Sequence, residues 1–128
     1  REFDYERIAD SVHYFCGRGL GLTPSGDDFL LGLLYVLNSL RSIPETSPDN
    51  LTPLVLEICR ERTTWLSYQL IRAACLGQVD ERLHNMAMVL TGNSSVHMSK
   101  AISDVATWGN SSGMDATSGM LAALSLYR

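Results

Sequence analysis

Two short segments of the chain combine serine, glycine and aspartate at the same spacing, and both lead into apolar residues. Residues 25–28 read Ser-Gly-Asp-Asp, and residues 112–115 read Ser-Gly-Met-Asp. Each is followed by a glycine four residues after its last aspartate, and the two copies lie 87 positions apart. The start of a helix leaves backbone N–H groups unpaired, and these can bind an anion such as phosphate or a carboxylate. The repeat therefore predicts a binding site at two helix N-termini.

The first motif follows a glycine-rich loop, residues 17–24, in which glycine lets a ligand approach the backbone. No strand precedes this loop, which excludes a dinucleotide fingerprint, and the Gly-Lys-Ser/Thr ending of a P-loop is missing. The residues predicted to bind an anionic substrate are small or hydroxyl residues of the loop and both motifs, together with one arginine: Gly19, Gly21, Thr23, Ser25, Gly26, Arg62, Ser112 and Gly113.

Three carboxylates are predicted to take part in catalysis, namely Asp27, Asp28 and Asp115. Neighbouring residues of a helix point about 100° apart, so Asp27 and Asp28 need not share a role. A Mg²⁺ ion held by these two residues is an alternative, because this hard cation accepts one or two carboxylates plus a phosphate.

A purely structural interpretation of the motifs also stays open. Ser25 with Asp28, and Ser112 with Asp115, match the Ser-x-x-acid capping box, in which each side chain pairs with the other residue's backbone N–H. Thr23 is a further candidate for the N-cap, with proline in the first turn.

Capping does not require the glycines that accompany the motifs. Asp28 and Gly32 fall on one helix face, as do Asp115 and Gly119. We expect the two helices to cross closely along this narrow face, which would bring the two Ser-Gly sites together about a pseudo-twofold axis.

The other polar and sulfur-containing residues give weaker signals. Arg62, Thr63, Thr64 and Ser67 form a polar cluster in which the arginine could neutralise an anion, or which could be an exposed helix face. The three histidines are isolated, and Cys16 is expected to be a buried small hydrophobe.

Apolar periodicity predicts an all-α bundle of about six helices in a single domain, residues 1–128. The expected helices run from residue 5 to Gly17, over 25–40, from 51 to Gly77 with a polar middle that could kink or split it, from 79 to Gly92, from 98 to Gly109, and from 112 onward. The helix over 25–40 is apolar almost all round, so it should be the buried centre. Residues 43–50 should form a surface loop.

Composition limits the classes of partner. The net charge of −4 and the scattered lysines and arginines argue against nucleic acid, and the longest apolar run is nine residues, short of the roughly 20 that span a membrane. Three cysteines without a CxxC pair indicate neither a disulfide framework nor a zinc site, and the cytoplasm is the expected compartment.

Residues 19–32, Gly-Leu-Gly-Leu-Thr-Pro-Ser-Gly-Asp-Asp-Phe-Leu-Leu-Gly, resemble the AllH-like family, long catalogued as a bacterial domain of unknown function. The second motif, over 111–119, and the segment from Arg62 to Gly77 are also similar to it. Family members are considerably longer, so the chain is expected to be the C-terminal part of such a protein.

The resemblance implies a subunit of a carbamoyltransferase with AllG-type and FdrA-type partner subunits. The implied reaction is phosphorolysis of a carbamoylated acid such as oxalurate, giving oxamate and carbamoyl phosphate, as in purine and allantoin degradation. The first motif would then bind the anion, Asp27 or Asp28 would face the carbamoyl NH₂ or Mg²⁺, and the second motif would complete the pocket.

Two other functions remain open. One is a non-catalytic helical subunit in which both motifs only cap helices, and the other is a metal-assisted hydrolase using Asp27 and Asp28. The oligomeric state, including a homo-oligomer, stays open as well.

Overall fold

The computed structural model describes residues 5–40 and 51–125, and these ranges contain helices and no strand. Seven α-helices follow one another: α1 (Tyr5–Phe15), α2 (Ser25–Leu34), α3 (Thr52–Cys59), α4 (Trp65–Cys75), α5 (Glu81–Leu90), α6 (Met98–Val105) and α7 (Ser112–Ser125). None of the helices in the described part of the chain is long and apolar enough to cross a membrane. The all-α prediction is confirmed, and the loop predicted over 43–50 lies outside the described residues.

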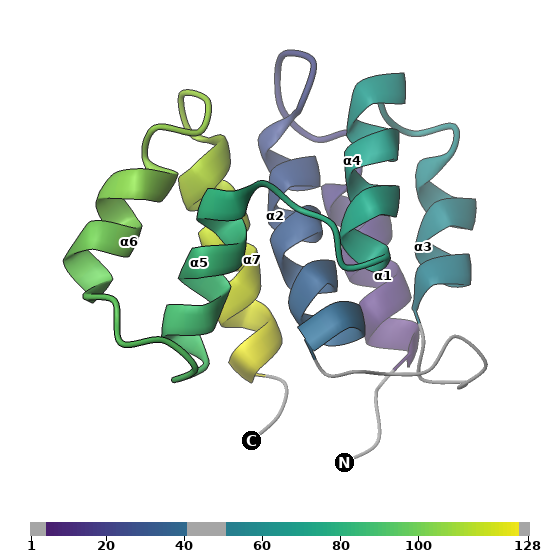
Figure 1. Cartoon of the computed structure of the whole chain (residues 1–128). Coiled ribbons are helices and arrows are strands. Elements are labelled where there is room, and N and C mark those ends of the chain that lie inside the picture. Colours follow the sequence, from purple (N-terminus) through teal and green to yellow (C-terminus); the bar gives the residue numbers. More distant parts are fainter. Residues whose placement is uncertain (1–4, 41–50, 126–128) are drawn as a thin grey trace.

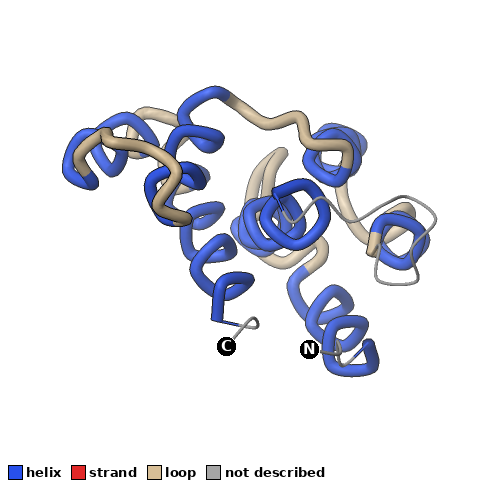
Figure 2. Tube along the Cα trace, turned by 60° about the horizontal axis from the view of Figure 1, so that its bottom comes forward, coloured by secondary structure: helices blue, strands red, loops and turns tan. Residues whose placement is uncertain are grey.

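Helix α2 is the centre of the molecule, as predicted. It continues without a break into a π-helical segment, η1 (Tyr35–Leu40), and its side chains Leu30, Leu34 and Leu37 are completely buried. Helices α5, α6 and α7 lie on one side of α2, and α1, α3 and α4 lie on the other (Figures 1 and 2). Burial on both sides explains why this segment is apolar almost all round.

The helical segment expected from residue 51 to Gly77, with a polar middle that could kink or split it, is split into two helices. Thr64 has an extended backbone with ψ of 156°, which interrupts the helical path between α3 and α4. Its hydroxyl accepts a hydrogen bond of 3.1 Å from the N–H of Ser67 and so caps the start of α4. The polar middle of the segment is therefore a helix stop followed by a new cap, and the described chain has seven α-helices rather than about six.

Helices α2, α4, α5 and α7 all begin at the same end of the molecule, the top in Figure 1. The partial positive charges at the N-termini of these helices therefore lie at one end of the fold. Both Ser-Gly-x-Asp motifs lie at this end, in the first turns of α2 and α7.

Helices α2 and α7 cross so closely that their backbones touch. A Cβ atom added to Gly32 would lie 1.8 Å from the carbonyl oxygen of Ala116, and one added to Gly119 would lie 1.9 Å from that of Phe29. Ala116 and Gly119 are the residues that follow Phe29 and Gly32 by 87 positions. The two contacts are therefore exchanged by the sequence repeat, which supports the predicted pseudo-twofold relation.

The loops that lead into these two helices repeat the same hydrogen bonds. The N–H of Arg18 donates to the carbonyl of the last residue of α1 (3.0 Å), and the Arg18 carbonyl accepts from the N–H of Gly26 (2.9 Å). Trp108 and Gly113 make the equivalent bonds in the second half, with the last residue of α6, both at 3.0 Å. The repeat thus includes a helix, a loop and a second helix in each half.

Replacement of either crossing glycine by alanine should destabilise the fold. We expect Gly32→Ala and Gly119→Ala each to lower the free energy of unfolding by about 2–3 kcal/mol, because the new methyl group meets backbone rather than a side chain that could rotate away. The better helix propensity of alanine, about 1 kcal/mol, offsets only part of this loss. Urea unfolding followed by circular dichroism measures the difference.

Ser118→Ala is the matched control for the glycine variants. Ser118 lies on the exposed side of α7, and its hydroxyl donates only to the Met114 carbonyl one turn back. This substitution should change stability by no more than about 0.5 kcal/mol. Glycine variants as stable as the control would contradict the close crossing.

Candidate functional site

Asp28 is a buried carboxyl at the point where the two motifs meet. It lies in the first turn of α2, and only 2% of its surface is exposed. Burial raises its pKa to about 6, the hydrogen bond with the Ser112 side chain lowers the pKa, and the negative charges of Asp115 and then Asp27 raise it. A serine and an aspartate from the start of α7 therefore act directly on a carboxyl at the start of α2.

This arrangement follows from the helix crossing. Gly32 and Gly119 lie one turn beyond Asp28 and Asp115 on the same helix faces, so close contact at the glycines brings the first turns together. Ser112, the first residue of α7, then forms a hydrogen bond with Asp28. The predicted proximity of the two motifs is present in the fold.

The capping boxes predicted from the sequence do not form. The N-cap of α2 is Pro24, which has no side-chain cap, so Thr23 is not the N-cap and exposed Ser25 is the first helical residue. In the second motif, the Ser111 hydroxyl donates to Oδ2 of Asp115 at 2.9 Å, one residue earlier than expected. A proline with its fixed φ of −54° starts α2 without any hydroxyl, which the Ser-x-x-Asp pattern did not reveal.

Gly26 and Gly113 have a packing role that sequence reasoning missed. A Cβ atom at Gly26 would lie 2.0 Å from the carbonyl oxygen of Phe15, and one at Gly113 would lie 1.8 Å from that of Val105. Their N–H groups donate to the Arg18 and Trp108 carbonyls. These two N–H groups are thus occupied by bonds within the fold.

Asp27 points away from Asp28 and orders the glycine loop. Its Oδ1 accepts a hydrogen bond of 2.7 Å from the N–H of Gly17, and its Oδ2 accepts one from the hydroxyl of Thr63. The two adjacent aspartates therefore face different neighbours, as the helical geometry predicted. Asp27 joins α2 to the loop before it and to the turn before α4.

The polar cluster before α4 holds the glycine loop in place. The hydroxyls of Thr64 and Ser67 donate to the Leu22 carbonyl at 2.5 Å and 3.2 Å. The Arg62 guanidinium, predicted to bind an anion, is exposed and donates to the His13 carbonyl at 3.0 Å. This cluster is neither a bare helix face nor bonded to Asp28, because its groups bond to α1, to Asp27 and to the glycine loop.

The remaining predicted binding residues lie in that loop. Gly19 and Gly21 have φ angles of +123° and +85°, which favour glycine, and both are exposed, whereas Thr23 is half-buried just before α2. The loop begins beside the Thr63 turn and ends at the N-cap of α2. These residues border the first motif but have no interaction with Asp28 among those the structure describes.

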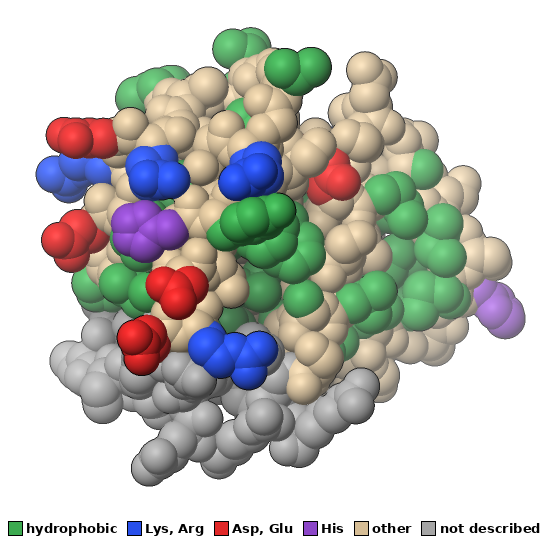
Figure 3. All heavy atoms as spheres, turned by 180° about the vertical axis from the view of Figure 1, so that it is seen from behind, with side chains coloured by type: hydrophobic (Ala, Val, Ile, Leu, Met, Phe, Trp, Pro, Cys, Tyr) green, Lys and Arg blue, Asp and Glu red, His purple; other side chains and the backbone are tan. Residues whose placement is uncertain are grey.

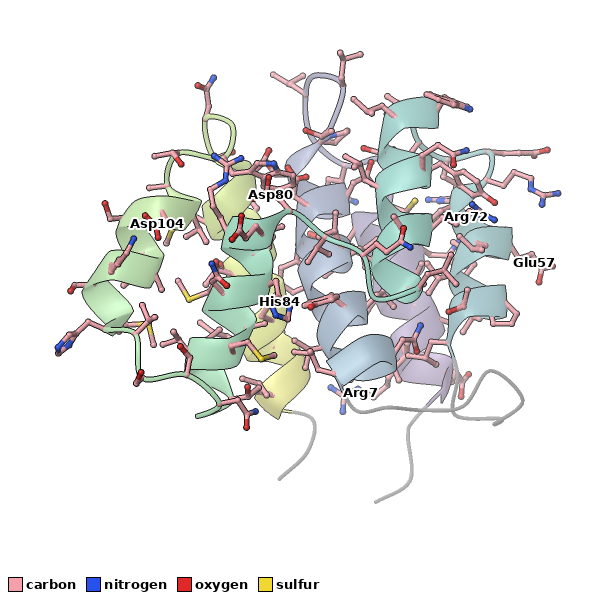
Figure 4. The ribbon with its side chains drawn as sticks, in the orientation of Figure 1. Arg7, Glu57, Arg72, Asp80, His84 and Asp104 are labelled. Atoms are coloured by element: carbon pink, nitrogen blue, oxygen red, sulfur yellow. The ribbon has the colours of Figure 1, made fainter. Side chains whose placement is uncertain are left out.

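Arg82 fixes the loop that leads into α7. Arg82 forms a two-point ion pair with Asp80 and donates to the Thr107 hydroxyl at 2.9 Å. Asp80, labelled in Figure 4, caps the start of α5. The Arg82 side chain lowers the pKa of Asp80. Thr107 lies in the loop before α7, so this arginine fixes the second loop as the Thr63 cluster fixes the first. The sequence pattern gave no signal for it.

The described residues contain no group of three or more His, Cys, Asp or Glu side chains placed to hold a metal ion. The three cysteines are free and buried, as expected for Cys16. A hollow of about 500 Å³ lies beside α3 and is lined by Pro53, Leu56, Glu57, Arg60 and Glu61. None of its lining residues belongs to either motif.

Ionised Asp28 should reduce stability, and the effect depends on pH. A folded-state pKa near 6 means that the native protein binds this proton more tightly than the unfolded chain, so this carboxyl costs stability as pH rises from about 4 to 6 and imposes the full cost above 6. Asp28→Asn should therefore raise the free energy of unfolding by about 1–3 kcal/mol at pH 7.5 and change it little at pH 4. Urea unfolding at the two pH values measures this.

Asp27→Asn is the contrasting variant. The asparagine side chain has an NH₂ group in place of one of the two oxygens that accept hydrogen bonds in Asp27. We therefore expect the free energy of unfolding to fall by about 1–2 kcal/mol at pH 7.5. Equal responses of the two variants, or an effect of Asp28→Asn that does not change with pH, would contradict the assigned environments.

Comparison with known protein families identifies the chain. A family model described as oxamate carbamoyltransferase subunit AllH matches residues 15–124. The match begins at the last residue of α1 and ends in α7, so it includes both motifs and the loops before them. No solved structure matches the chain. Since the family model covers most of its length, the chain belongs to the AllH family.

Proposed function

We propose that this chain is the carbamoyltransferase subunit in which Asp28 transfers a proton to and from the substrate. Membership of a family described as a carbamoyltransferase subunit supports the reaction class. The observation that carries the proposal is the buried Asp28 carboxyl, with a pKa of about 6, between Ser112 and Asp115. A carboxyl with this pKa exchanges its proton close to neutral pH, as general acid and base catalysis requires.

The proposed substrate is oxalurate or a similar carbamoylated acid. In its phosphorolysis, a phosphate oxygen forms a bond to the carbamoyl carbon, and the bond from this carbon to the amide nitrogen breaks. The nitrogen leaves with the electron pair and takes the proton of Asp28, which yields oxamate and carbamoyl phosphate. The proton that the attacking hydrogen phosphate loses restores protonated Asp28. In the reverse direction, ionised Asp28 removes the proton from the amide nitrogen of oxamate as this nitrogen attacks carbamoyl phosphate.

The ends of α2 and α7 provide the proposed environment for the anions. Both helix N-termini favour negative charge. The exposed Ser25 hydroxyl at the start of α2 is the proposed donor to an anion, whereas the Ser112 hydroxyl at the start of α7 bonds to Asp28. Gly26 and Gly113 shape the site through packing in this proposal. Gly19, Gly21 and Thr23 are proposed for the rim, and Arg62 is proposed to hold α1 through the His13 carbonyl.

The proposed site requires other subunits. Asp28 is almost completely covered by this chain alone, so the proposal requires the ends of α2 and α7 to open locally to the substrate. A partner subunit facing these ends would form the rest of the pocket. AllG-type and FdrA-type subunits are the proposed partners, and the cytoplasm is the proposed compartment.

The contacts of the motif residues bear differently on the two alternative functions, a metal-assisted hydrolase and a non-catalytic interaction subunit. A metal-assisted hydrolase on Asp27 and Asp28 is disfavoured because both Asp27 oxygens accept hydrogen bonds from Gly17 and Thr63. A non-catalytic interaction subunit has support in the exposed leucines of the glycine loop. Its premise that the motifs are caps is not met at α2.

The test is the pH dependence of phosphorolysis by the enzyme assembled from this chain and its partner subunits. Asp28→Asn should lower kcat about 10²–10⁴-fold and remove the ionisation near pH 6 from the profile of kcat/KM. Ser112→Ala should move this ionisation to higher pH, and Asp115→Asn should move it to lower pH, because the serine lowers and the aspartate raises the Asp28 pKa.

Titration of phosphate itself cannot produce these opposite shifts, which assign the ionisation to Asp28. Asp104→Asn is the control, since Asp104 lies on α6 in an exposed ion pair with Lys100 and should leave the profile unchanged. A wild-type rate for Asp28→Asn would overturn the proposed function.

A further inference from the structure

The glycine loop holds two leucines in solvent at the end of the molecule where α2, α4, α5 and α7 begin. Leu20 is 94% exposed and Leu22 is 70% exposed. Trp65 and Leu66, at the start of α4, are 75% and 38% exposed. The loop projects beyond the helices at the top of Figure 1, next to the start of α4. We refer to these four side chains as the apolar knob.

The knob is a built feature and not a loose loop. The hydroxyls of Thr64 and Ser67 donate to the Leu22 carbonyl, which joins the loop to the start of α4 directly beside Trp65 and Leu66. The base of the loop is fixed as well, since the Gly17 N–H donates to Asp27 and Arg18 stacks 4.0 Å from the ring centre of Tyr14. The chain thus uses several hydrogen bonds to keep apolar side chains in water, and exposed apolar groups held in this way are typical of binding surfaces.

The charges around the knob indicate what covers it. Arg18, Arg60 and Arg62 are exposed near the loop and the turn before α4, and Glu61 is the exposed acid among them. In a chain with a net charge of −4, this is a local excess of positive charge. Figure 3, seen from behind, shows hydrophobic side chains at the top and, below them, Lys and Arg side chains with Asp and Glu side chains at the same level.

We infer that the apolar knob docks into another subunit of the same enzyme, in an apolar groove with carboxylates along its rim. The positive rim of the knob complements such a groove, whereas a second copy of this chain would bring the same arginines together. The family is described as an enzyme subunit, which supplies a partner protein. The inference rests on the proposed function in placing this partner over the start of α2, where Asp28 lies.

Binding of this chain to purified FdrA-type and AllG-type subunits tests the inference. We expect the wild-type chain to bind, more weakly at high salt, and Leu20→Ser with Leu22→Ser to raise Kd at least about 100-fold. Trp65→Ala should raise Kd about 10-fold or more. These side chains are mostly exposed, so circular dichroism and thermal unfolding should remain those of the wild type.

Ile102→Ser with Leu121→Ser is the matched control, because these apolar side chains of α6 and α7 are 43% and 52% exposed but lie outside the knob. Kd for the control should stay within about threefold of the wild type. A knob variant that binds as the wild type does, or a wild-type chain that does not bind the partner subunits, would overturn the inference.

Two other occupants give different results. Sedimentation of the chain alone that shows a dimer lost in the knob variant would assign the knob to a second copy. Binding to phosphatidylglycerol vesicles that the variant loses would assign it to a lipid surface. Either result overturns the inference. Normal docking together with a wild-type rate for Asp28→Asn would instead remove the proposed chemistry and leave the docking surface in place.

Discussion

The contact between the backbones of α2 and α7 sets the positions of the other parts of the fold. It exists because Gly32 and Gly119 have no side chain where each helix meets a carbonyl oxygen of the other. Any other residue at either position would push the axes apart by the width of at least a methyl group. The first turns of both helices, with Asp28 and Ser112, would then separate, and the hydrogen bond that joins the motifs would be lost. The crossing is thus a packing constraint with a chemical consequence.

The site created by this crossing is unfavourable for stability. A carboxyl that is 2% exposed and lies near two other carboxylates keeps its charge only at a free-energy cost, and its pKa near 6 expresses that cost. Asp27, one residue earlier, shows the usual solution, because its oxygens accept hydrogen bonds from Gly17 and Thr63. Two adjacent aspartates in one helix turn therefore have opposite effects on stability. A residue such as Asp28, which lowers stability, is expected where its side chain has a role in the chemistry.

The sequence predicted the helical class, the central helix and the close crossing, because each depends on a periodic or repeated pattern of residues. The buried helix could be predicted from the apolar residues of α2, and the crossing face from the spacing of Asp28 and Gly32, without knowledge of distant contacts. The predicted capping boxes do not form, because Pro24 starts α2 without a side-chain cap and Ser112 pairs with Asp28 across the helix crossing. Local spacing does not distinguish these geometries from a capping box. The role of Thr63 was invisible for a similar reason, since its partner Asp27 is 36 positions away. The chemical roles of the site residues remain predictions.

The two halves of the repeat differ in the loop that precedes the motif, and this difference separates chemistry from recognition. Nine residues join α1 to α2, and six join α6 to α7. Both loops nevertheless make the same two backbone bonds, one to the end of the preceding helix and one from the glycine N–H of the following helix. The shared bonds suffice to place Gly26 and Gly113, so the extra residues of the first loop are not needed to build the crossing. They include the exposed leucines, and the Thr64 and Ser67 hydroxyls hold them in place. The two pseudo-symmetric halves that position Asp28 thus differ in one feature, the exposed leucines of the first loop. A partner that binds these leucines would therefore bind beside α2 and not beside α7.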